Sequence, residues 1–112
     1  MNVTHIDIGR DFATNLGPRY KKDGKHSGQE FRERLLEPAF VRSDVVVISL
    51  DSIGGYSASF LEEAFGGLVR QHGYAEVSRK LKLDAVARAY LKPVIEQWMR
   101  DADPSAGTGA TK

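Results

Sequence analysis

Three short segments of the chain have the hydrophobic pattern of β-strands. Residues 3–8 alternate between apolar and polar side chains, as a first or edge strand does. Residues 44–51 are rich in β-branched residues and apolar at consecutive positions, which predicts a central strand covered on both faces. Residues 80–83 alternate briefly and predict a third strand.

A first helix is predicted to begin at Gly28. Ser27 and Glu30 have the spacing of a capping box, in which each side chain satisfies a free backbone amide at a helix start. Apolar residues then recur at steps of about four, so one face packs inward, and we expect Arg32 and the two residues after it to face water. Pro38 is expected to end the helix, because proline cannot donate the hydrogen bond that continues it.

A second helix is predicted to begin at a cap formed by Ser59, with Glu62 completing a capping box, and to end at Gly73. Its apolar residues form a continuous stripe. Gly66 and Gly67 lie inside this helix, where glycine lowers helix stability. They indicate either the close approach of another backbone element or a surface for a partner, and the sequence does not separate the two.

The last helical pattern covers residues 86–100, with Asp84 as its expected cap. Pro93 falls inside it and predicts a kink or a break. Residues 9–26 are polar, basic and interrupted by glycine and proline, as a long loop is. Residues 103–112 have the small polar composition of a disordered tail.

The order strand, helix, repeated three times, predicts an α/β fold: a small sheet, parallel or mixed, packed by about three helices. A chain of 112 residues fits one domain, here residues 1–102. Its 16 basic and 15 acidic residues nearly cancel, so net charge indicates no partner. The absence of cysteine excludes disulfides, zinc-thiolate sites and thiol nucleophiles and suits a reducing cytoplasm. We expect no secretory leader, and the longest apolar stretch is far too short for a membrane span.

Residues 51–60 carry the most informative feature of the chain, a hydroxyl-rich turn between the central strand and the second helix. Sheet proteins commonly keep their working surface at such a junction. Ser59 is expected to cap the helix. Ser57 is either a turn-stabilising hydroxyl or a regulatory one, and Tyr56 either covers the edge of the core or anchors an interface.

An enzymatic function is not expected. Residues 55–59 partly imitate the nucleophile elbow of hydrolases, but that mechanism needs an acid followed by a histidine later in the chain. The only downstream histidine, His72, precedes Asp84. The three histidines are scattered without ligand spacing, so we expect no metal and no cofactor.

The basic loop at residues 19–26 supports an alternative function, binding of nucleic acid or of a small anionic ligand. Tyr20 is available there for stacking. The four cations of the loop lie beside Asp23, the domain is nearly neutral, and no nucleic-acid motif accompanies them. A solvated loop is therefore the preferred interpretation over nucleic-acid binding.

Two stretches of the chain resemble a known family. They are residues 17–34, with the elements Gly-x-Arg, Asp-Gly and Ser-Gly-x-Glu-Phe-Arg, and residues 59–67, Ser-Phe-Leu-Glu-Glu-Ala-Phe-Gly-Gly. Both are similar to the bacterial STAS-like domain of unknown function. The resemblance implies a regulatory, non-enzymatic role like that of anti-sigma factor antagonists, which dock on an ATP-binding partner kinase. The implied partner is thus a protein, with a histidine-kinase-like ATPase as the candidate.

In the antagonists, the partner phosphorylates the first serine of an Asp-Ser-Ser-Gly motif at a helix start. Overlaying that motif puts Ala58 at the phosphoacceptor position, so Ser57 and Ser59 are the candidate phosphoacceptors in a shifted register. If the first two strands are parallel neighbours, the starts of both helices meet at one edge of the sheet. The predicted partner-binding residues are Arg19, Asp23, Ser27, Tyr56, Ser57 and Ser59.

Overall fold

A computed structural model describes residues 1–104 and has the predicted α/β architecture. Within these residues one sheet contains three parallel strands in the order β1 (Val3–Asp7), β2 (Val45–Ser49) and β3 (Leu81–Asp84). The third strand, predicted from only four residues, is confirmed. The strand order follows the chain order, so each connection crosses from one strand to its immediate parallel neighbour.

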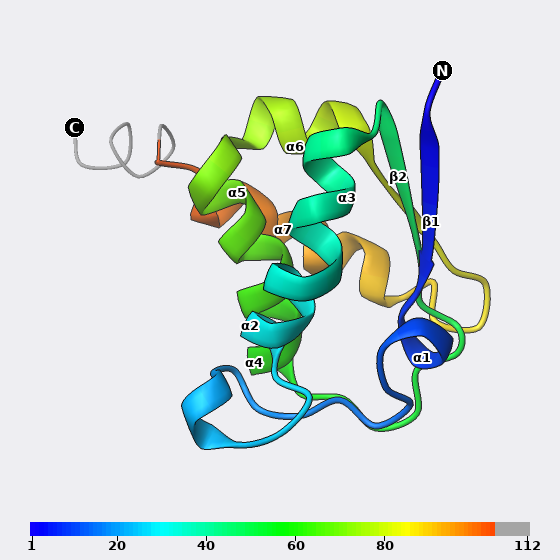
Figure 1. The fold of residues 1–112 in the computed structure, drawn as a ribbon, viewed down its shortest axis with the longest axis vertical. Coiled ribbons are helices and arrows are strands. Elements are labelled where there is room, and N and C mark those ends of the chain that lie inside the picture. Colours follow the sequence, from blue (N-terminus) through cyan, green and yellow to red (C-terminus); the bar gives the residue numbers. More distant parts are fainter. Residues whose placement is uncertain (105–112) are drawn as a thin grey trace.

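Two long helices connect the strands, and each contains a π-helical turn in its middle. The first consists of α2 (Gly28–Phe31), η2 (Arg32–Leu36) and α3 (Glu37–Arg42), and the second of α4 (Ala58–Leu61), η3 (Glu62–Gly66) and α5 (Gly67–His72). The remaining helical elements are α1 (Ile8–Asp11), the 3₁₀ turn η1 (Lys21–Asp23), α6 (Tyr74–Lys80) and α7 (Leu91–Ala102). Figure 1 shows the two long helices side by side on the same side of the sheet.

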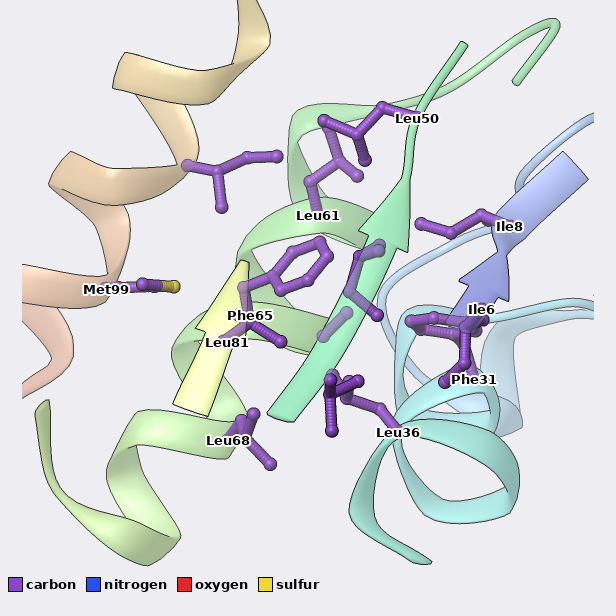
Figure 2. Packing of buried hydrophobic residues seen from close by; sticks show 14 of the residues in the cluster. Ile6, Ile8, Phe31, Leu36, Leu50, Leu61, Phe65, Leu68, Leu81 and Met99 are labelled. Carbon is purple, nitrogen blue, oxygen red and sulfur yellow. The ribbon is translucent and has the colours of Figure 1, made fainter. Parts of the chain in front are cut away.

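The core lies between the sheet and these helices, where Figure 2 shows it from close by. Val46 and Ile48 of β2 are fully buried, whereas Val45, Val47 and Ser49 alternate with them and stay partly exposed. The prediction that this strand is covered on both faces is therefore wrong. Right-handed crossovers between sequential strands place both helices on one face and leave the other face without a helical layer.

Pro38 does not end the first helix, which continues to Arg42. In the π-helical turn just before it, the amide of Glu37 bonds to the carbonyl of Arg32, five residues earlier. This wider turn relieves the clash that proline makes with the carbonyl of the preceding turn. Arg32 itself is buried, so its predicted exposure is also wrong.

The region after the second helix differs most from the prediction. Gly73 ends α5 with a positive φ of 87°, as expected, but a further helix, α6, follows at once. Asp84 is the last residue of β3 and caps no helix. The final helix begins only at Leu91, so Pro93 lies in its first turn, where no helical hydrogen bond is lost and no kink results.

Most of the predicted tail, residues 105–112, lies outside the described residues. The loop predicted at residues 9–26 is confirmed apart from the short turns α1 and η1. Over residues 1–104, no helix combines the length and the apolar character needed to cross a membrane.

Candidate functional site

The turn after β2 is held in place by its first two polar side chains. Asp51 accepts hydrogen bonds from the amides of Arg88 (2.9 Å) and Val86 (2.8 Å) in the segment after β3. These bonds hold the pKa of Asp51 below its ordinary value. Ser52 donates to the carboxylate of Asp7 and accepts from the amide of Gly9 (2.9 Å), which ties the turn to the end of β1.

The loop before the first helix is hydrogen-bonded to the same turn. The amide of Gly54 donates to the carbonyl of Thr14 (2.7 Å), and the amide of Leu16 donates to the carbonyl of Gly55 (2.8 Å). The side chain of Asn15 accepts from the amide of Gly55 at 3.0 Å. Segments forty residues apart thus share one continuous set of hydrogen bonds.

The starts of the two long helices meet, as predicted from parallel strands. The contact depends on Gly28, because a Cβ at this position would collide with the carbonyl oxygen of Phe60. The amide of Gly28 in turn donates to the carbonyl of Pro18 (2.9 Å). Ser27 caps the first helix by accepting from the amide of Glu30 at 3.0 Å, which confirms the predicted cap, and it is completely buried.

The cap of the second helix is Ser57, so the prediction of Ser59 is wrong. The hydroxyl of Ser57 accepts from the amide of Phe60 at 3.1 Å and reaches the carbonyl of Gly17 at 3.4 Å. Ser59 is the second residue of the helix and is exposed, and its hydroxyl has no hydrogen-bond partner among residues 1–104. Glu62, which the capping-box prediction assigned to the helix start, bonds elsewhere.

Glu62 belongs to an ion-pair network between the long helices and the basic loop. Its carboxylate accepts from Arg19 at 2.5 Å and from Arg70 at 2.8 Å. Burial acts to raise the pKa of Glu62, but the hydrogen bonds from Arg70 and Arg19 outweigh it and leave the pKa below its ordinary value. Beside it, Arg32 and Glu63 form a buried pair at 2.8 Å. The guanidinium of Arg19 is thus paired with a carboxylate of the domain itself.

The two glycines of the second helix make room for this network. A Cβ on Gly67 would lie 2.5 Å from Nε of Arg32, and one on Gly66 would collide with the carboxylate of Glu62. The close approach predicted at these positions is real, but the neighbours are charged side chains and not another backbone element.

Tyr56 projects from the turn and joins a cluster that the sequence did not indicate. The guanidinium of Arg88 lies over its ring at 5.4 Å and donates to the hydroxyl of Tyr90 at 3.0 Å and to the carbonyls of Ile53 and Gly54. The two tyrosine hydroxyls are 3.5 Å apart. Tyr56 and Tyr90 remain 38% and 55% exposed. We call Tyr56, Arg88 and Tyr90 the tyrosine patch.

The basic loop carries fewer free charges than its sequence suggests. Besides Arg19, Lys21 is paired with Glu33 at 2.7 Å. Lys22 lies 5.9 Å from the ring of Tyr20, and Asp23 is exposed in η1. A shallow hollow of about 490 Å³ lies here, lined by Tyr20, Lys21, Lys22 and Gln29.

The six predicted partner-binding residues therefore do not share one exposed surface. Tyr56 and Ser59 are exposed at the turn, Ser57 is half-buried as a cap, and Ser27 is buried. Of the two residues of the basic loop, Arg19 is paired with Glu62 and Asp23 is exposed to solvent. The prediction did not include Arg88 and Tyr90. They lie far from the turn along the chain, so the sequence did not indicate their contact with it.

Comparison with known proteins bears on the region just described. Residues 27–88, more than half of the chain, match the family model of the STAS-like domain of unknown function (DUF4325). The matched range contains both helix starts, the turn and most of the ion-pair network. No curated protein and no solved structure shows a significant match. The chain therefore belongs to the family of STAS-like domains of unknown function.

Proposed function

We propose that this domain is a non-enzymatic, regulatory interaction module that docks on a partner protein through the turn at residues 51–60. The exposed tyrosine patch carries the proposal. Tyrosine and arginine dominate the energetic centres of protein interfaces, because they bury a large area with few rotatable bonds and still offer hydrogen bonds. The carbonyl bonds of Arg88 hold this patch rigid, so little conformational entropy is lost on docking.

We further propose that the partner is an ATP-binding kinase of the histidine-kinase-like type, met in the cytoplasm of a prokaryote. This part follows the likeness to anti-sigma factor antagonists. Of the two candidate phosphoacceptors, Ser59 fits such a partner better. Its hydroxyl is exposed, whereas the hydroxyl of Ser57 is occupied in capping. Arg19 and Arg70 neutralise Glu62, so the nearest turn of the helix repels a phosphate less than the sequence suggested.

Affinity capture from the source organism with matched variants tests the docking surface. Tyr56→Ala is compared with Tyr20→Ala, because the two tyrosines are similarly exposed, at 38% and 41%, but lie on different surfaces. We expect an ATPase that the wild type and Tyr20→Ala capture and that Tyr56→Ala loses. Capture unchanged by Tyr56→Ala would contradict the proposal. Mass spectrometry of the captured bait tests Ser59, and phosphate on neither Ser57 nor Ser59 would remove the phosphorylation step.

The hollow at the basic loop supports the alternative function, binding of a small anionic ligand at residues 19–26. Lys22 and Tyr20 line it, and Lys22 has no carboxylate partner among residues 1–104. Against this, the pairing of Arg19 and Lys21 with carboxylates halves the charge available to an anion or to nucleic acid. In the capture experiment, loss of the partner with Tyr20→Ala alone would move the docking surface from the turn to the basic loop, and salt-dependent binding of inorganic phosphate or an oligonucleotide that Tyr20→Ala weakens would favour the alternative.

A further inference from the structure

A groove lies between β3 and α7. Its volume is about 380 Å³. Leu81 and Leu83 of β3 and Pro93 and Met99 of α7 form its apolar part. Figure 2 shows Met99 pointing from its helix toward Leu81. No other segment of residues 1–104 fills this space.

β3 is an edge strand, and its free edge borders this groove. The carbonyl of Asp84 accepts from the amide of Leu50, next to β2, at 3.0 Å. Because backbone groups of alternate residues in a strand point to opposite sides, Lys82 and Asp84 bond toward β2. The amide and carbonyl of Leu83 therefore point away from the sheet, into the groove.

Natural proteins protect such an edge with proline, bulges or charged side chains. β3 contains no proline, and its protection is limited to its short length and the charged side chains of Lys82 and Asp84, which leave the outward backbone groups free. An unpaired edge of this kind is a template on which an extended segment can add as a further strand, with backbone hydrogen bonds supplying affinity. A strand of four residues spans roughly 13 Å, about the length of β3.

The charges at the rim of the groove indicate the chemistry of its partner. Lys82 and Lys92 line the groove, are exposed, and have no carboxylate partner among residues 1–104. The one acidic residue of the lining, Glu96, is already bonded to Tyr74 and lies 3.7 Å from Arg100. The groove thus offers positive charge at the rim over an apolar floor.

We propose that this groove binds an extended peptide segment of a partner protein, with apolar side chains at alternate positions and carboxylates at its flanks. The segment adds to β3 as a fourth strand. Its backbone bonds to Leu83, alternate apolar side chains enter the groove, and the flanking carboxylates meet Lys82 and Lys92. This site is separate from the tyrosine patch and does not depend on the function proposed for it.

The test is a titration of the isotope-labelled domain with a synthetic peptide, acetyl-Glu-Val-Thr-Val-Glu-amide, followed by amide chemical shifts and hydrogen exchange. We expect saturable shifts along β3 and α7 and slower exchange of the Leu83 amide. The same peptide with lysine in place of both glutamates should bind about fivefold or more weakly, from two exposed charge pairs. The double variant Lys82→Glu/Lys92→Glu should reverse this preference.

Leu83→Pro supplies an independent test, because it removes the outward amide without touching the bonds to β2. Leu83→Val keeps that amide and controls for the shortened side chain, and thermal unfolding shows whether each variant folds. Binding lost in Leu83→Pro and kept in Leu83→Val supports strand addition. Tyr56→Ala should bind the peptide as the wild type does.

Three results would overturn the proposal. They are absence of saturable shifts at β3, equal binding of the acidic and basic peptides, and shifts confined to the tyrosine patch. Shifts confined to the tyrosine patch would leave the proposal of docking at the turn intact. If Tyr56→Ala loses partner capture and the peptide causes no shifts at the groove, only the docking proposal is supported. The two proposals can therefore be refuted independently of each other.

Discussion

Replacing Ser57 or Ser59 with alanine tests which serine caps the second helix. The hydroxyl of Ser57 accepts from the amide of Phe60 at 3.1 Å, and loss of such a cap costs about 1 kcal/mol. Its contact with the carbonyl of Gly17, at 3.4 Å, is at the limit of a hydrogen bond and adds a few tenths of a kcal/mol at most. We therefore expect Ser57→Ala to lower the free energy of unfolding by about 1 to 1.5 kcal/mol.

For a domain of this size, that loss corresponds to a fall in Tm of roughly 4 to 6 °C. Ser59→Ala is the matched control, because Ser59 is exposed and only two residues away, and it should change stability by less than about 0.5 kcal/mol. Ser57→Asp should restore most of the loss, because aspartate also caps and its charge suits a helix start.

Urea and thermal unfolding followed by circular dichroism measure all three variants. A destabilised Ser59→Ala together with an unaffected Ser57→Ala would refute the assignment of the cap. Failure of Ser57→Asp to recover stability would instead show that the hydroxyl acts through its contact with Gly17 and not through the helix amide.

Three further changes probe the contacts beneath the site. Arg32→Met should lower the free energy of unfolding by up to about 3 to 5 kcal/mol, because it leaves the buried Glu63 with only its longer contacts to Arg19 and Arg70, and the double variant with Glu63→Met should lose clearly less in a urea-unfolding cycle. Gly28→Ala should cost more than the 1 kcal/mol or so of an ordinary surface change, since the new Cβ meets the rigid backbone of Phe60, and thermal unfolding measures it. Backbone amides depress the pKa of Asp51 in the folded state, so its contribution to the free energy of unfolding is present above about pH 4 and is lost as pH falls through the folded pKa. Asp51→Asn should be less stable than the wild type at pH 7, and urea unfolding at decreasing pH should show the stabilities of the two proteins converging.

The fold class and the strand order could be read from the sequence, but the number of covered faces could not. A run of apolar β-branched residues at 45–48 is typical of a strand buried on both sides. In the structure Val46 and Ile48 face the core while Val45 and Val47 do not. β-Branched residues favour strands whether or not a second layer is present, so this composition does not distinguish the two cases.

The predicted cap of the second helix lies two residues too late, for a physical reason. Two serines stand two residues apart, and the presence of Glu62 three residues after Ser59 favoured the second. That glutamate is drawn away by Arg19 and Arg70, which reach it from distant parts of the chain. Local spacing predicts a capping box only when tertiary contacts leave its members free.

Arg32 and the tyrosine patch show the same limit. Helical periodicity places a charged residue on the outer face, but a partner carboxylate and the space above Gly67 allow Arg32 to be buried. Arg88 and Tyr90 were assigned to a helix that begins only after them. Their contact with Tyr56 depends on the irregular backbone of residues 85–90, for which the sequence carries no periodic signal.

The hydrogen bonds between the loop at residues 14–16 and the turn at residues 54–55 have a consequence for signalling. If a partner docks on the turn as proposed and displaces it, the bonds from Gly54 to Thr14 and from Leu16 to Gly55 would carry the displacement to the loop that leads to the first helix. Docking at the start of the second helix would then also affect the start of the first. Two backbone amides, those of Leu16 and Gly54, act as built-in reporters whose solvent exchange would reveal engagement before any large movement of the domain.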